Sequence, residues 1–173
     1  MSDTPEAAVE IVAFDPQWSC RFQEERALLE TALGPWLAGP IEHIGSTAVP
    51  GLAAKPVIDI MAGVATLESS RGAIIAAQDV GYCYFPYRPE VMHWFCKPSP
   101  AQRTHHLHLA PVGSPLWVER LAFRDYLRSH ASVAAEYAEL KRRLAEQHRF
   151  DRERYTDEKA PFVQEVLERA LKP

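Results

Sequence analysis

The sequence predicts an α+β fold, with a mixed, mostly antiparallel β-sheet of about five strands, helices on one face and a C-terminal helical segment. Two observations favour it. Strand-like and helical segments alternate up to about residue 112, and from Ser114 onward the apolar spacing is helical only. A chain of 173 residues is also long enough for one well-buried domain and short for two. We therefore predict a single domain over 1–173, with an α/β sheet core over 1–112 and C-terminal helices over 113–173.

The individual elements follow from apolar spacing and from proline and glycine boundaries. Asp15-Pro16 is typical of a helix start, and apolar residues recur at helical spacing from there to Trp36. Further helices are expected over 66–80 and in three segments after Ser114. Strands are predicted over 9–14, 41–44, 57–64, 82–87, 91–97 and 104–110.

Composition argues against several classes of function. The net charge is −4, so the chain lacks the basic surface that general nucleic-acid binding requires. No apolar run is long enough to span a membrane, and Met1–Glu10 lacks the basic and apolar regions of a secretory signal. Cys20, Cys83 and Cys96 have no metal-binding spacing, and we expect reduced thiols in a cytoplasmic protein.

The most informative segment is 42–61, where one short strand runs into Gly45-Ser46-Thr47 and the next carries Asp59. A glycine and hydroxyl groups directly after a strand let the backbone approach a phosphate closely. Lys55 precedes a proline, which holds it extended beside this segment, and Arg103 begins a neighbouring strand. We therefore predict phosphate binding by Gly45, Ser46 and Thr47, with Lys55 or Arg103 neutralising charge.

Strand alternation predicts which side chains share a face with Asp59. Ile58 and Ile60 should face the core, so Asp59 projects from the opposite face. In the strand over 104–110, His106 and His108 alternate with core leucines and should stand on the face of Asp59. One carboxylate and two imidazoles can bind a divalent transition metal or transfer protons. The alternative is that the histidines only form structural hydrogen bonds.

Other cationic side chains are weaker candidates for binding an anion. Arg88 and Lys97 lie in or beside neighbouring strands. Tyr155 and Lys159 are one helical turn apart and can close over a ligand, although a solvated surface is the favoured interpretation of that pair.

The stretches HIGSTAVPGLAAKPVIDI, HHLHL, FRDYLRSH and YTDEKAPFVQEVLERA resemble the GrpB-like family, and the resemblance covers about Val9 to Leu171. That family is similar to the DNA polymerase beta-type nucleotidyltransferase superfamily, and also to the domain fused to dephospho-coenzyme A kinase in some bacteria. The superfamily resemblance implies that Gly45 and Ser46 clamp a triphosphate. It also implies that Asp59 and a second acid two residues later hold Mg²⁺ ions.

The chain departs from the superfamily at this second acid, because the position is Met61, a poor ligand for Mg²⁺. His106 and His108 occupy the strand expected to carry a third acid, and imidazole suits Zn, Mn or Fe better than Mg. Three possibilities follow: a transferase with an altered metal site, a metal-dependent phosphohydrolase, or a nucleotide-binding domain without catalysis.

We therefore expect a nucleotidyltransferase-like protein that binds a nucleotide or another phosphorylated small molecule. In the active form Asp59, His106 and His108 would be catalytic and would hold a divalent metal (Mg, Mn or Zn). The alternative is a non-catalytic module that docks onto a protein partner, such as an enzyme of coenzyme A biosynthesis.

Overall fold

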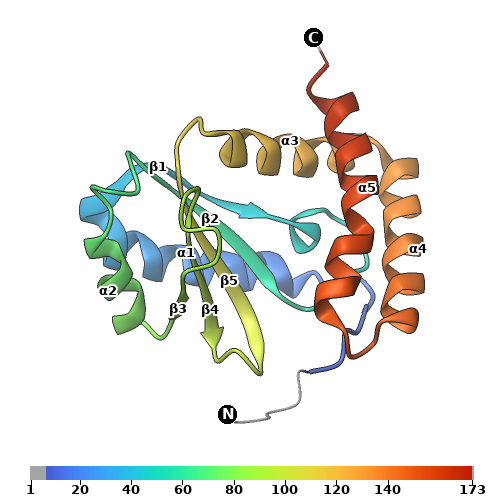
Figure 1. Ribbon diagram of the computed structural model, residues 1–173, viewed down its shortest axis with the longest axis horizontal. Helices are drawn as coiled ribbons and strands as arrows, with labels where there is room; N and C mark the ends of the chain where they lie inside the picture. Colours follow the sequence, from blue (N-terminus) through green and yellow to red (C-terminus); the bar gives the residue numbers. More distant parts are fainter. Residues whose placement is uncertain (1–6, 173) are drawn as a thin grey trace.

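A five-stranded mixed sheet forms the centre of the protein, which is described by a computed structural model covering residues 7–172 (Figure 1). The strands are β1 (Leu37–Ile44), β2 (Ile58–Val64), β3 (Cys83–Phe85), β4 (His93–Pro98) and β5 (Arg103–Pro111). The helices are α1 (Gln17–Leu33), α2 (Gly72–Asp79), α3 (Pro115–Ser129), α4 (Ala131–Gln147) and α5 (Arg152–Ala170). Short 3-10 turns, η1 (Gly34–Trp36) and η2 (Ser46–Ala48), flank β1.

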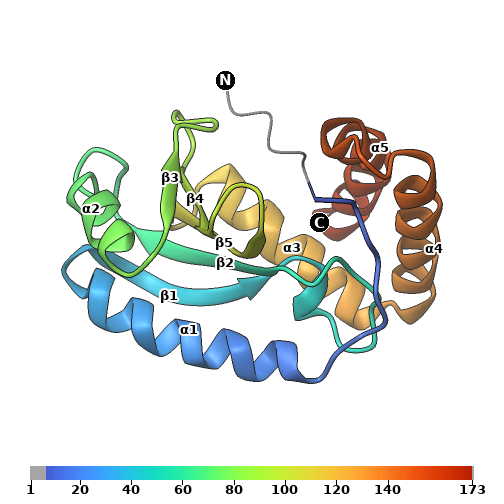
Figure 2. The same ribbon diagram turned by 90° about the horizontal axis from the view of Figure 1, so that it is seen from below.

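The sheet order is β1-β2-β5-β4-β3, in which only β2 and β5 run parallel. This confirms the predicted mixed, mostly antiparallel sheet of an α+β fold. Helices α1 and α2 cover one face, α3 crosses the other, and α4 and α5 stand beside one end of the sheet (Figures 1 and 2). No helix among residues 7–172 is both long and apolar enough to cross a membrane.

The predicted strand over 9–14 is wrong. Only an isolated bridge forms there, in which Val12 and Ala54 exchange two backbone hydrogen bonds of 2.9 and 3.0 Å. The segment instead runs along the C-terminal helices, where Val9 packs with Leu144 and Tyr155 (Figure 2). The first six residues of the Met1–Glu10 segment lie outside the described residues.

The helix predicted over 66–80 begins only at Gly72. The preceding turn is held by hydroxyl groups: the Thr66 hydroxyl accepts from the backbone N–H of Ser69 at 3.0 Å, and Ser70 Oγ donates to the Thr66 carbonyl at 2.7 Å. Such side chains offer the backbone an alternative to the helical ladder, which delays the helix start.

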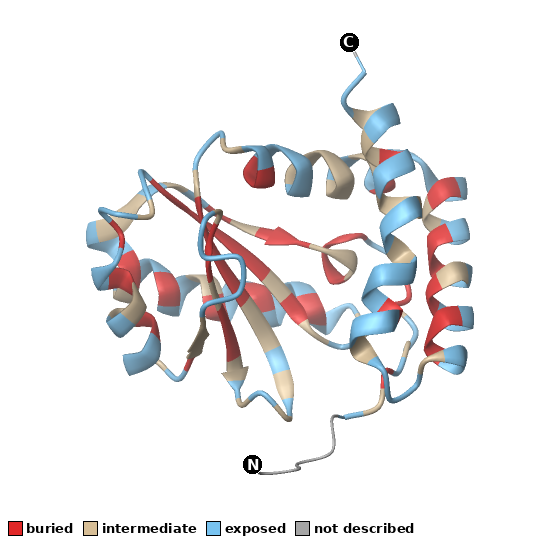
Figure 3. Ribbon diagram, in the orientation of Figure 1, coloured by how far each residue is buried: buried red, intermediate tan, exposed pale blue. Residues whose placement is uncertain are grey.

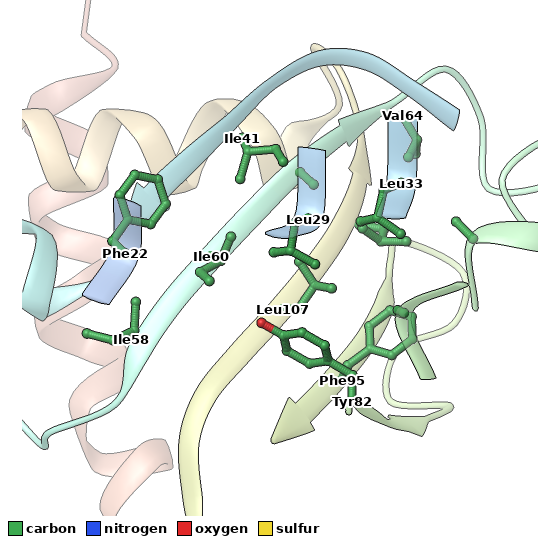
Figure 4. Close-up of a cluster of buried hydrophobic side chains, with 14 of the residues drawn as sticks. Phe22, Leu29, Leu33, Ile41, Ile58, Ile60, Val64, Tyr82, Phe95 and Leu107 are labelled. Carbon is green, nitrogen blue, oxygen red and sulfur yellow. The ribbon is translucent and has the colours of Figure 1, made fainter. Parts of the chain in front are cut away.

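The main core lies between the sheet and helices α1 and α2, as burial along the strands shows (Figures 3 and 4). Ile58, Ile60 and Leu107 point into it, as strand alternation predicts. His105 also faces this side, with Nε2 3.9 Å from Glu25 Oε2, and Lys97 Nζ donates to Glu25 Oε1 at 2.6 Å. Lys97 is therefore on the opposite side of the sheet from Asp59, paired with an acid.

The face that carries Asp59 is partly covered rather than open along its length. Met61 is 0% exposed and packs with Leu116 and Trp117 of α3. Asp59, two residues earlier, keeps a side chain that is 29% exposed. Helix α3 thus closes one half of this face and leaves the half around Asp59 accessible.

Candidate functional site

A cavity of about 460 Å³ lies between the end of the sheet around Asp59 and the C-terminal helices. Its volume falls in the range typical of small-molecule sites. Residues from the β1–β2 segment, β2 and β5 form one wall, and residues of α3, α4 and α5 form the other. The C-terminal segment therefore supplies the second wall of a cleft. All predicted site residues line this cavity except Arg103.

Gly45 brings the loop after β1 against Asp59. Its φ of +72° and ψ of −170° belong to a region that is essentially restricted to glycine. A Cβ atom at this position would lie 2.6 Å from Asp59 Oδ2. Glycine is therefore required here for the close approach of the loop to the carboxylate, in addition to any role in approaching a phosphate.

Thr47 holds the loop in place. Its side chain is buried, and its hydroxyl donates to the Val57 carbonyl at 3.3 Å. Because that hydroxyl proton is used, His43 Nε2–H is the donor in the 2.9 Å contact with Thr47 Oγ1. Burial lowers the pKa of His43 to about 4, so this imidazole is neutral. The Thr47 hydroxyl is thus committed to the protein, whereas Ser46 Oγ faces a lysine described below.

His106 and His108 share a face with Asp59, which confirms their predicted placement. His106 Nδ1 lies 3.0 Å from Asp59 Oδ1, and His108 Nε2 lies 3.9 Å from the same oxygen. Burial opposes the charge of Asp59, but hydrogen bonding to the two histidines holds its pKa well below the usual range. Because an ionised Asp59 can only accept, His106 Nδ1–H is the donor in this contact, and Nε2 is the other ring nitrogen. That Nε2 is buried and has no hydrogen-bond partner among residues 7–172.

Three lysines from different elements line the same cavity as the Gly45-Ser46 loop. Lys141 of α4 is 2% exposed, and its Nζ donates to Ser46 Oγ at 2.9 Å and to the Ala53 carbonyl at 2.5 Å. Lys159 of α5 and Lys55 lie over the ring of Tyr155, with Nζ 4.4 and 5.1 Å from its centroid. The cavity thus has a strongly positive end next to the predicted phosphate loop.

Burial, together with the charges of Lys159 and Lys55, lowers the pKa of Lys141 to about 7. The pKa of Lys159 is also lowered to about 7, first by burial and then by Lys55. Both pKa values are lowered, as expected for ammonium groups that are partly removed from water and lie near other cations with little negative charge nearby.

Sequence reasoning missed Lys141 and favoured a solvated position for Lys159. The signal was present in α4, because Lys141 continues the i, i+4 stripe of Val133 and Tyr137, which are buried. A lysine inside the apolar stripe of an amphipathic helix indicates a buried charge with a specific role.

Arg88 lines the cavity from the loop between β3 and β4, and its backbone is strained. Its φ is +48° although it carries a side chain and precedes Pro89, and both features disfavour that conformation. Arg103, by contrast, does not line the cavity. Its guanidinium lies 5.4 Å from the ring centroid of Trp94, and its Nε donates to the Pro100 carbonyl at 3.0 Å.

Replacing Arg88 by glycine should therefore stabilise the fold and weaken anion binding together. Relief of the strained backbone should raise the free energy of unfolding by up to about 1 kcal/mol, net of the entropy that glycine loses. Loss of the guanidinium should reduce the affinity of the cavity for a polyphosphate anion, with ATP as the probe, by roughly threefold to tenfold. Urea denaturation and calorimetric titration check the two effects. Arg88→Lys, which keeps both strain and charge, serves as control, and unchanged affinity in Arg88→Gly would remove Arg88 from the site.

Comparison with known proteins identifies the family of this chain. The family model described as "GrpB protein" matches residues 8–169. The chain belongs to the GrpB family. A UPF0157 protein of Pseudomonas aeruginosa is 38% identical over 176 residues, which cover 98% of this chain and 71% of the relative. The crystal structure of the conserved protein GrpB from Enterococcus faecalis superposes with a TM-score of 0.85 at 32% identity, covering 94% of this chain and 97% of that one.

Other relatives of this GrpB-family chain are longer. YqkA of Bacillus subtilis is 34% identical over 166 residues, and the chain spans 96% of its own length but 48% of YqkA. A protein of Mycolicibacterium paratuberculosis named dephospho-CoA kinase is 28% identical over 189 residues, which cover 95% of this chain and 46% of the kinase. The GLD-2/RNP-8 complex aligns with a TM-score of 0.59 at 14% identity, covering 90% of this chain and 60% of that chain. The GrpB-family fold is nucleotidyltransferase-like.

The superfamily resemblance implies divalent metal ions, which need several oxygen or imidazole donors close together. No three His, Cys, Asp or Glu side chains among residues 7–172 are placed to hold a metal together. Asp59 Oδ1 is hydrogen-bonded to His106, and Met61 is fully buried at the second acid position. Glu42, the nearest acid on β1, pairs with Arg124 at 2.6 Å. The residues present therefore do not fit a metal centre of the type that the superfamily resemblance implies.

Proposed function

We propose that this GrpB-family protein binds a nucleotide or another phosphorylated small molecule, with the phosphates at the positive end of the cavity. The observation that supports the proposal most is that Lys55, Lys141 and Lys159 line one cavity with the Gly45-Ser46 loop, where Lys141 donates to Ser46. Five cationic side chains line the cavity, against two acidic ones. This excess of positive charge in a concave site favours an anionic ligand.

The energetics of the lysines support the same conclusion. Lys141 donates to a hydroxyl and a carbonyl, neither of which carries a net charge. Removing an ammonium group from water without an opposite charge is costly. A bound phosphate would supply that charge and form charge-assisted hydrogen bonds with the lysines. Phosphate binding would thus offset the unfavourable free energy of the buried ammonium groups in the unliganded cavity.

Replacing Lys159 by methionine tests the proposal. We expect calorimetric titration to give at least a roughly tenfold loss of affinity for ATP, because one charged contact to phosphate is removed. The variant should fold with equal or greater stability, since its repulsion with Lys55 is gone. Lys172→Met removes an exposed lysine outside the cavity and should bind ATP as the wild type does. Adenosine, which lacks phosphates, should bind far more weakly than ATP. Equal binding of adenosine and ATP would contradict phosphate recognition.

We further propose that Asp59 and His106 supply the chemistry if the protein turns its ligand over, as in nucleotidyl transfer. Asp59 accepts from His106 Nδ1–H and thereby orients the ring, and a carboxylate hydrogen-bonded to an imidazole is a pair that can transfer a proton. The test is turnover of ATP by wild type and Asp59→Asn, in EDTA and with Mg²⁺, Mn²⁺ or Zn²⁺. Equal activity of Asp59→Asn and wild type would contradict the catalytic part of the proposal.

A second candidate function, a docking module, is favoured by the relative named dephospho-CoA kinase, in which the similar segment is 46% of the length. In that case a dephospho-CoA kinase without such a segment would bind this protein. His106→Ala combined with His108→Ala should leave that association intact. Loss of association in the folded double variant would count against the module.

A further inference from the structure

We infer that the cavity binds its phosphorylated ligand as the metal-free anion, with the ammonium groups of Lys55, Lys141 and Lys159 in the charge-neutralising role of divalent cations. The inference rests on the proposed phosphate-binding function and adds the ionic form of the ligand to it. It is carried by two independent sets of contacts, one around the carboxylates and one around the lysines.

The carboxylates expected near the predicted phosphate loop either already interact with other protein groups or are replaced by another residue. Asp59 Oδ1 accepts from His106 Nδ1, and Asp59 Oδ2 lies against the backbone of Gly45. Met61 removes the second acid of β2, and Glu42 forms its 2.6 Å ion pair with Arg124. The other acid that lines the cavity is Glu119 of α3. A bound Mg²⁺ needs octahedral oxygen ligands, and proteins usually supply one or two carboxylates beside the phosphates. Here at most part of one carboxylate is available at the phosphate loop.

The lysines, in contrast, are preorganised around that loop. Lys141 Nζ forms two hydrogen bonds with the protein, which fixes its position and leaves one of its three protons for a ligand. The rings of Tyr137 and Tyr155 hold the ammonium groups by cation–π contacts, with Lys141 Nζ 4.6 Å from the Tyr137 centroid. The groups that contact Lys141 and Lys159 here are a hydroxyl, a carbonyl and two aromatic rings, none of which carries a net charge.

The same arrangement disfavours a divalent cation. A doubly charged ion that enters the loop region meets three ammonium groups in a partly buried space, where repulsion is stronger than in water. Arg88 and Arg120 add positive charge at the other parts of the lining. A phosphate ligand without a bound cation, in contrast, is attracted by all of these lysine and arginine side chains.

The experiment titrates wild-type protein calorimetrically with inorganic tripolyphosphate and with ATP, once in excess EDTA and once with Mg²⁺. Tripolyphosphate isolates the phosphate contacts, because it has no base or sugar. We expect both ligands to bind in EDTA with an affinity at least equal to that with Mg²⁺. In EDTA, Lys159→Met should lose at least roughly tenfold in affinity, whereas Lys172→Met should match the wild type.

The outcomes separate this inference from the function on which it rests. Binding that requires Mg²⁺ and disappears in EDTA would overturn the metal-free form and leave the phosphate-binding function standing. No binding of either ligand in either buffer would overturn both. Equal affinity of Lys159→Met and wild type in EDTA would also overturn the inference, since the lysine cluster would then not neutralise the phosphates.

Discussion

ATP should bind this protein much more weakly at about pH 9 than at pH 7. The pKa values of Lys141 and Lys159 are both about 7 in the unliganded protein, so both side chains lose their protons across this interval. A phosphate needs the charged ammonium form, and each lysine that must be reprotonated at two pH units above its pKa costs about 2.7 kcal/mol. Because the phosphates need both lysines protonated, and each is already half deprotonated at pH 7, we expect a loss of affinity on the order of a thousandfold, measured by calorimetric titration. Affinity that does not change between these pH values would contradict the assignment of these lysines to the site.

The stability of the unliganded protein should change in the opposite direction. The folded-state pKa of each lysine, about 7, is below the ordinary value of 10.5 that applies in the unfolded chain. Below pH 7 both states hold the proton, and the folded state carries the full cost of the buried ammonium groups. Above pH 7 the folded state releases protons that the unfolded state keeps, so stability rises from pH 7 to about pH 9. Urea denaturation checks this, and Lys159→Met should show a smaller rise.

Replacing Gly45 by alanine should destabilise the fold by about 3 kcal/mol. The backbone conformation, with φ +72° and ψ −170°, costs a residue with a side chain about 1–3 kcal/mol. The added methyl group would also lie 2.6 Å from Asp59 Oδ2, so the loop or the carboxylate must move. Because Gly45 and Ser46 form the predicted phosphate loop, movement of this loop should weaken phosphate binding as well.

Gly51→Ala is the matched control for this substitution. Gly51 also has a positive φ, +80°, but nothing lies within 4 Å of an added Cβ. The Gly51→Ala variant should lose only about 1 kcal/mol of stability and should bind ATP with the affinity of the wild type. Equal losses of stability in the two variants, measured by urea denaturation, would show that contact with Asp59 has no special role at Gly45.

Local rules predicted much of the fold and part of the site. Strand alternation correctly placed Asp59, His106 and His108 on one face of the sheet, because successive side chains of a strand point to opposite faces. The segment over 9–14 was mistaken for a strand, since Val9 is buried by α4 and α5, contacts that alternation cannot anticipate.

The cationic half of the site depends on tertiary packing and could not be read from local pattern alone. Lys141 lies 95 residues from Ser46 in the sequence, and only the docking of α4 beside the loop joins them. Arg103 was wrongly predicted for the same reason. Its place at the start of β5 suggests a phosphate contact, but tertiary packing puts its guanidinium over the ring of Trp94.

The most direct test of the account is an NMR titration of the lysine side chains, with ¹³C-labelled lysine, in the absence and presence of tripolyphosphate. Lys141→Met and Lys159→Met assign the signals. The account predicts that two lysines titrate near pH 7 in the free protein and that tripolyphosphate raises both pKa values. Lysine signals that all titrate near 10.5, or that do not respond to tripolyphosphate, would contradict a phosphate site built around this cluster.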